Sequence, residues 1–397
     1  MNEETPRPSA NAPRLQVPLA CLLLFGAMFN LTLVVAGLKE FVIDELGGTV
    51  RDATLFFSVE TFAYILFAPV WGVLSDRIGR RQPLVIVGFL LSSLAYTAYG
   101  LVESVSALLV LRFFQGGASV MGWSLVMAML VDDSDPNRRG RQMGLMGAAL
   151  IFGVAVGAPM GGYMTRWHGA RAPLTAAAIS FALLALGAWW LRESGGLRRG
   201  VRLREIATAI RGTPLLLMPM LFHFVDRLAV GLFVVVFPLY LDSLAAGDAA
   251  VRGRYLGLFL IPFAFLQYFT GRLVDKTGPY PPLLVGSALY GVLLCFVGYS
   301  GLELLWPVMA GLGLLAAVMF PPAIFLTAQI AAPEARGSAM AGFNVAGSLG
   351  FAIGPLLGGW AYGNWGFAVA FVICGVIEVA VALVGALVLL RLGRKAS

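Results

Sequence analysis

The stretch GVLSDRIGRRQPL, residues 72–84, separates two apolar runs that are each long enough to cross a lipid bilayer. Its glycines, its single acid and its clustered arginines predict a tight, charged, water-facing hairpin between two membrane helices. The residues of this loop motif are Gly72, Asp76, Arg77, Gly79, Arg80 and Arg81.

A weaker copy of this loop, GRLVDKTG, occupies residues 271–278. Asp275 thus lies 199 positions (275 − 76) after Asp76 in a chain of 397 residues. The repeat predicts that the chain consists of two related halves.

The composition is that of a membrane-embedded chain. Apolar residues make up 59% and charged residues 12%, whereas soluble proteins contain about 45–50% and about 25%. The hydropathy pattern predicts an all-α membrane protein with twelve transmembrane helices. The expected spans are 17–43, 54–74, 83–102, 105–130, 142–165, 172–191, 214–241, 254–274, 282–301, 303–330, 338–361 and 366–390.

Basic residues predict the orientation, because they stay on the cytoplasmic side during insertion. With a cytoplasmic N-terminus, most of the 28 Lys and Arg residues fall on the cytoplasmic side. The net charge of +7 is then a topology signal and an attraction for anionic lipid rather than a nucleic-acid site. We expect residues 1–191 to form one bundle, 192–213 a basic cytoplasmic linker with a short amphipathic helix, and 214–397 the second bundle.

The loop motif resembles the G-x-L-x-D-R-x-G-R-R signature of the major facilitator superfamily. This resemblance implies two six-helix bundles of the major facilitator fold that alternate access to a small-molecule site between them. It also implies function as a monomer in a cell membrane, most simply the bacterial inner membrane, with both termini cytoplasmic. The sequence contains no zinc-protease motif, no phosphate-binding Walker loop and no nucleophile with an evident base, so neither an enzyme, a cofactor nor a metal site is expected.

Glycine motifs in the fifth and eleventh spans repeat at an offset of 197 positions (350 − 153). Small residues four positions apart let helices approach closely, and a proline inside a helix favours a bend, so each motif predicts a packing seam with a hinge. The residues are Gly153, Gly157, Pro159 and Gly161 in one half, and Gly350, Gly354, Pro355 and Gly358 in the other. The first motif resembles the signature of the family's antiporters, although its proline is displaced by one position.

An arginine within the fourth span, Arg112, needs a partner or water because a charge inside the membrane is costly. Glu60 in the second span lies at the same predicted depth, about 9–10 Å from the outer end at 1.5 Å per residue. We expect the two side chains to pair. By resemblance to the R-x-x-Q-G motif of proton-coupled members, Arg112 is also a candidate for proton handling; a purely structural salt bridge is the alternative.

The seventh span carries His223, Asp226 and Arg227, with Asp226 about 18 Å from its start. Ionisable groups at this depth are candidates for function, and burial and a neighbouring guanidinium have opposite effects on a carboxylate's proton affinity. By resemblance the cluster faces the central cavity and binds the coupled proton; a neutralised structural pair is the alternative. Glu378 in the peripheral last span is interpreted as a packing or lipid-facing residue.

Substrate contacts are less evident, and the candidates are Tyr64, Trp123, Gln267 and Asn344. The sequence as a whole favours a secondary transporter that exports an amphipathic small molecule in exchange for protons. Uptake of a sugar or an organic anion, lipid translocation, and, more distantly, a membrane-bound enzyme or a sensor remain alternatives.

Overall fold

The computed structural model describes residues 16–132, 139–192, 203–244, 248–332 and 335–396. All elements within these ranges are helical. They are α1 (Gln16–Leu33), η1 (Lys39–Glu45), α2 (Val50–Ile78), α3 (Gln82–Tyr99), α4 (Val105–Asp132), α5 (Arg139–His168), α6 (Ala172–Ala188), α7 (Leu203–Gly212), η2 (Pro214–Leu216), α8 (Leu217–Ser243), α9 (Ala249–Thr277), α10 (Tyr280–Val297), α11 (Leu302–Ile330) and α12 (Arg336–Ala396).

Within the described ranges, nine helices are long and apolar enough to cross a membrane, and α1 and α6 are shorter apolar helices. One of the nine, α12, combines two helices on either side of Gly366, whose φ of 82° lies in the left-handed region. The count of crossing segments in this part of the chain is therefore twelve, as the hydropathy pattern predicts.

Local signals set the ends of α2. Thr49 and Asp52 form a capping box at its start, in which each side chain accepts a hydrogen bond from the other residue's backbone N–H. Gly79 ends the helix in the left-handed conformation, with φ 73°, and α3 begins three residues later. The predicted hairpin between two membrane helices is thus present.

The first predicted span, 17–43, is wrong at its C-terminal end. The α-helix stops at Leu33, and after a turn the chain forms the π-helix η1 over Lys39–Glu45. This break frees the Ala36 carbonyl from helical bonding, and the guanidinium of Arg252 in α9 donates to it at 3.2 Å.

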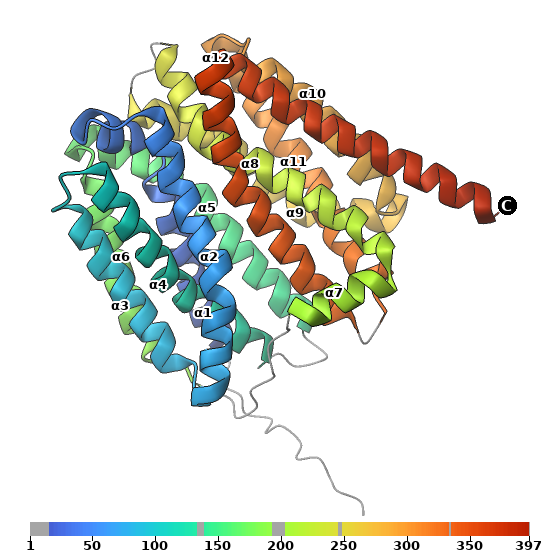
Figure 1. Ribbon diagram of the computed structural model, residues 1–397, viewed down its shortest axis with the longest axis horizontal. Coiled ribbons are helices and arrows are strands. Elements are labelled where there is room, and N and C mark those ends of the chain that lie inside the picture. The colour runs from blue at the N-terminus through green and yellow to red at the C-terminus, as the bar shows by residue number, and fades with distance from the viewer. Residues whose placement is uncertain (1–15, 133–138, 193–202, 245–247, 333–334, 397) are drawn as a thin grey trace, which may run out of the picture.

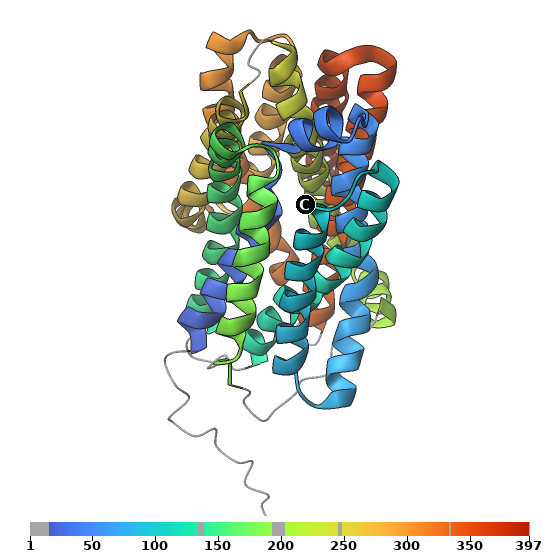
Figure 2. The ribbon, with the colours of Figure 1, turned by 90° about the vertical axis from the view of Figure 1, so that its left-hand side faces the viewer.

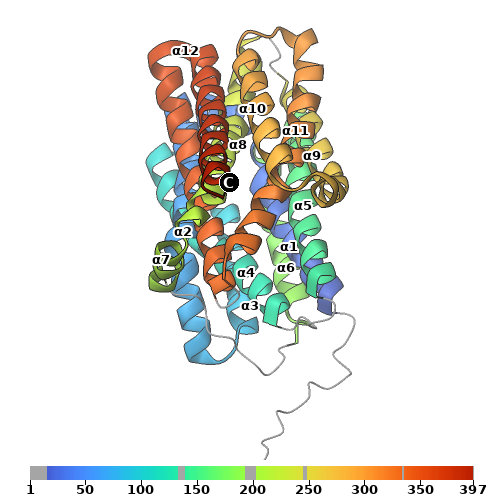
Figure 3. The same ribbon diagram turned by 90° about the vertical axis from the view of Figure 1, so that its right-hand side faces the viewer.

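The predicted short amphipathic helix between the halves is present as α7 (Leu203–Gly212). Figures 1 and 3 show that it runs across the direction of the long helices rather than alongside them. Its place at a membrane surface stays a prediction.

The helices pack as two groups. In the N-terminal half α1 packs on α5 and α6, α3 on α4 and α6, and α2 on α4, and Figure 2 faces this side of the molecule. In the C-terminal half α12 packs on α8 and α10, and α11 on α9 and α10. The main contacts between the halves are α5 with α9 and α2 with α12.

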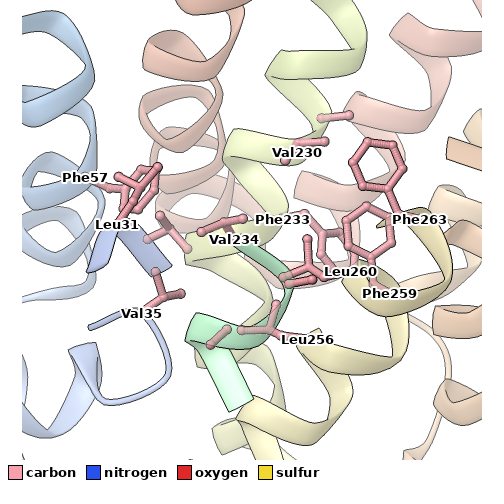
Figure 4. Packing of buried hydrophobic residues seen from close by; sticks show 14 of the residues in the cluster. Leu31, Val35, Phe57, Val230, Phe233, Val234, Leu256, Phe259, Leu260 and Phe263 are labelled. Carbon is pink, nitrogen blue, oxygen red and sulfur yellow. The ribbon is translucent and has the colours of Figure 1, made fainter. Parts of the chain in front are cut away.

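Apolar side chains continue from one half into the other. Figure 4 shows Leu31 and Phe57 of the N-terminal half near Val234 of α8, followed by Phe233 and Phe259 deeper in the C-terminal half. Phe57 also packs edge-on against Phe351 of α12, with ring centroids 5.4 Å apart. The two groups of helices therefore share one apolar core.

Candidate functional site

The structure pairs Arg112 of α4 with Glu60 of α2. Their closest atoms, Nη2 and Oε2, are 2.5 Å apart, and the side chains are 0% and 1% exposed. Arg112 also donates to the Phe56 carbonyl at 3.3 Å, the Tyr96 hydroxyl at 3.0 Å and the Gln115 amide oxygen at 2.9 Å. The guanidinium lies 4.0 Å from the centre of the Phe56 ring. This charge pair is compensated from several directions.

Two of the predicted cavity residues extend this network. Tyr64 donates its hydroxyl to the second oxygen of Glu60 at 2.8 Å, and its ring meets Trp123 edge-on at 5.6 Å. Both aromatic side chains are half-buried. The network thus connects a fully buried ion pair with side chains that retain some exposure.

The predicted cluster on α8 is also brought together. Arg227 donates from Nε and Nη2 to the same oxygen of Asp226, Oδ2, at 2.8 and 2.6 Å. His223 Nδ1 lies 4.0 Å from that oxygen, and its ring stacks on Phe343 with centroids 3.9 Å apart. Among the described residues, Asp226 Oδ1 and His223 Nδ1 are buried without a hydrogen-bond partner. Asp226 therefore has one neutralised oxygen and one unused oxygen.

Asp226 also lines a small pocket of about 10 Å³. It is lined by Phe222, His223, Asp226, Leu283, Ser287, Met319, Phe320 and Ala323. That volume suits about one water molecule.

The structure also buries a third acid, Glu378. Its side chain is 0% exposed, which excludes the lipid-facing interpretation and leaves the packing interpretation. It faces α10, where a Cβ on Gly291 would lie 3.0 Å from the Glu378 Cβ. The last span is apolar throughout, which gives no amphipathic pattern from which the inward face could be recognised.

The loop motif forms a charged contact within the N-terminal half. Arg81 is buried and pairs with Asp132 at the end of α4, at 2.5 Å, and with Asp76 at 3.7 Å. Arg77 and Arg80 are exposed. The corresponding side chain of Asp275 lies outside the described part of the structure. A conformational role for the motif stays a proposal.

The glycine motifs form equivalent helix–helix seams in the two halves. In α5, Cβ atoms added at the three motif glycines would overlap the backbone of α1 at Phe25, Phe29 and Leu33, for Gly153, Gly157 and Gly161 respectively. In α12, the corresponding overlaps are of Gly350 with Phe224, Gly354 with Leu228, and Gly358 with the side chains of Leu232 and Val236 in α8. The prolines of the motifs, Pro159 and Pro355, lie inside continuous helical segments, and their action as hinges stays a proposal.

Charged residues join the halves at the end of the molecule that carries η1. Arg252 of α9 is 0% exposed and forms ion pairs with Glu40 of η1 and, at 3.4 Å, with Asp242 of α8. Lys39 of η1 contacts Asp242 at 3.6 Å. Arg166 at the end of α5 contacts Asp248, the N-cap of α9, at 2.9 Å. We call the residues of these ion pairs the η1-end network: Lys39, Glu40, Arg166, Asp242, Asp248 and Arg252. The sequence alone did not single them out.

Two predicted cavity residues remain. Asn344 is exposed on α12, and the side chain of Gln267 lies outside the described residues. Chemically, the two halves each hold a buried acid paired with an arginine, and both acids are placed to bind a proton if their arginine withdraws.

Comparison with known proteins identifies the family. The sequence model of the Major Facilitator Superfamily matches residues 20–244 and 219–397. The multi-drug resistance efflux pump PmrA of Streptococcus pneumoniae is 26% identical over 333 residues, 80% of this chain and 81% of that protein. The synaptic vesicular amine transporter of Rattus norvegicus is 26% identical over 354 residues, 85% of this chain and 66% of that protein. The class G tetracycline resistance protein of Vibrio anguillarum is 29% identical over 60% of this chain and 63% of its own.

Solved structures share the same fold. A bacterial homolog of the human lysosomal transporter Spinster, in an inward-facing and occupied conformation, superposes with a TM-score of 0.80 at 15% identity, over 96% of this chain and 97% of its own. The nucleoside transporter NupG superposes with a TM-score of 0.76 at 13% identity, over 94% and 98%. The fold, the paired seams in the two halves and the match of the family's sequence model over both halves agree, and the chain belongs to the Major Facilitator Superfamily.

Proposed function

We propose that this transporter exports an amphipathic small molecule in exchange for protons, and that Asp226 binds the coupled proton. Membership of the family makes the chain a multi-pass secondary transporter of a small molecule and not an enzyme. The direction of transport, the proton and the class of substrate are the proposed part.

The observation that carries the proposal is the environment of Asp226. Asp226 has one oxygen bonded to Arg227 and one without a described partner, and its residue lines a pocket of water size. Such a buried acid suits a group that gains and loses a proton. Protonation of Asp226 would release Arg227, whose guanidinium already lies 4.9 Å from the centre of the Phe320 ring on α11. A proton bound at one side chain could therefore alter the packing of α8 against α11.

Export of amphipathic compounds is supported by the relatives named as an efflux pump, an amine transporter and a tetracycline resistance protein. With both termini cytoplasmic, the η1 end would face outward. The η1-end network would then close the outer entrance in the described conformation, and proton binding from outside would require this network to open.

Accumulation of fluorescent lipophilic compounds in an efflux-deficient bacterium tests the proposal. Cells with the wild-type protein should accumulate less dye than cells with the empty vector, and an uncoupler or Asp226→Asn should abolish the difference. Glu103→Gln is the matched control, because Glu103 is an exposed acid in the loop before α4. An Asp226→Asn protein that still exports against the gradient would exclude Asp226 as the proton site, and wild-type cells that accumulate more dye than the vector control would indicate uptake.

A further inference from the structure

The third buried acid, Glu378, forms no ion pair among the described residues. Neither of its carboxyl oxygens has a hydrogen-bond partner among the described residues, although the side chain is 0% exposed. An isolated carboxylate in such a site costs several kcal/mol of free energy relative to water. A carboxyl group that carries a proton avoids this cost.

The charged surroundings of Glu378 are few. Asp226 and Arg227 of α8 are its charged neighbours, and Tyr290 and Cys374 are the titratable groups beside it. Arg227 places both of its hydrogen bonds on Asp226. Two carboxyl groups therefore share one neighbouring guanidinium, and this guanidinium neutralises Asp226.

Polar groups of α10 connect the two acids. The Ser287 hydroxyl lies beside the Glu378 carboxyl and contacts the Met319 sulfur at 3.6 Å. Ser287 and Asp226 both line the water-sized pocket. Tyr290, one turn further along α10, has a fully buried hydroxyl without a described partner. The polar groups thus run from α8 through α10 to α12 inside one half.

We propose that Glu378 is a second proton-binding site, connected to Asp226 through Ser287 and one water molecule in the pocket. In this relay Glu378 gives its proton to the Ser287 oxygen, the hydroxyl proton of Ser287 passes to the water, and the water protonates Asp226 Oδ1. Asp226 becomes neutral and releases Arg227, which then compensates the Glu378 carboxylate, and no proton is gained or lost overall. The relay rests on the proposed function of Asp226, whereas the proton on Glu378 does not depend on it.

Infrared spectroscopy of the full chain in lipid vesicles at neutral pH tests the site without any transport substrate. The wild-type protein should show a C=O stretching band of a protonated carboxyl group, and this band should disappear in Glu378→Gln. Glu303→Gln is the matched control, because Glu303 is an exposed glutamate at the start of α11, and its variant should keep the band. A band of equal intensity in wild type and Glu378→Gln would overturn the proposal.

The relay has its own readout, which does not depend on folding of a Glu378 variant. In D₂O the band should shift as the proton exchanges, and Ser287→Ala should slow this shift severalfold, whereas Ser287→Thr, which retains a hydroxyl, should not. An unchanged exchange rate in Ser287→Ala would exclude the route through α10. If the band behaves as expected but no proton-driven export is found, the proposed function fails and the proton site on Glu378 stands.

Discussion

At the scale of single residues, Arg112 and Glu60 form the most completely bonded charge pair described above. Arg112→Ala removes the only described cation beside a carboxylate that is 1% exposed. The loss of one partner of a buried pair costs about 3–5 kcal/mol of unfolding free energy. Because Glu60→Gln removes the charge that would be left unpaired, the double variant should be less destabilised than the sum of the singles, by about 0.5–3 kcal/mol.

Unfolding in detergent, followed with a thiol-reactive dye in a background without Cys21 and Cys295, measures this coupling, because Cys374 is fully buried and reacts only when the fold opens. Glu103→Gln again provides the control for loss of one acid from an exposed position. Single-variant effects that simply add would show that the two side chains stabilise the protein independently.

Contacts between side chains were predictable where they depended on depth in the membrane. They were unpredictable where they depended on how a helix is rotated about its axis. Glu60 and Arg112 could be matched because both lie six or seven residues from the same membrane surface. Tyr96 could not be assigned to Arg112, because that contact depends on how α3 and α4 are rotated against each other. Packing and lipid exposure both remained open for Glu378, because the choice between them also depends on helix rotation.

At the scale of helices, the glycine seam between α5 and α1 should be sensitive to a single methyl group. A Cβ on Gly161 would overlap the Leu33 carbonyl oxygen, so Gly161→Ala should lower the unfolding free energy by about 1–3 kcal/mol. Gly147 lies on the same helix with no atom within 4 Å of its added Cβ. Gly147→Ala should therefore be neutral or gain about 0.5–1 kcal/mol, because alanine is the better helix former. Thermal unfolding of the two purified variants measures these changes in unfolding free energy. If Gly161→Ala and Gly147→Ala changed it equally, α5 and α1 would not pack closely at Gly161.

Helix types and most helix ends followed from local signals, but the end of α1 did not. The apolar pattern continues past Leu33, so hydropathy extended the predicted span to residue 43. The helix stops earlier, and in the turn that follows it the Ala36 carbonyl accepts a hydrogen bond from Arg252 of the other half. Such a contact joins residues more than two hundred positions apart and leaves no local signal.

At the scale of the whole molecule, the repeated glycine and loop motifs predicted two related halves, and the family match covers both. The contacts that hold the halves together were not predictable. The residues of the η1-end network appeared only as the few charges on the outer side of the predicted topology, and their pairing depends on how the halves dock.

Arg252 is the central group of this network, and its loss should shift the molecule toward a conformation that is open at the η1 end. Arg252→Gln removes ion pairs to Glu40 and Asp242, and each 1.4 kcal/mol of lost interaction changes the ratio of two conformations about tenfold.

A cysteine placed at Thr54 reports on this opening, because Thr54 is 1% exposed and packs against Gly359 across the halves. In a background without the three native cysteines, a water-soluble maleimide should label this site severalfold faster in Arg252→Gln than in the otherwise unchanged protein. Arg254→Gln, which removes an exposed arginine two residues further along α9, should leave the rate unchanged. Equal labelling rates in the two variants would show that the η1-end network does not hold the halves together, and the proposed closure of the outer entrance would then rest on the packing of α5 against α9 and of α2 against α12.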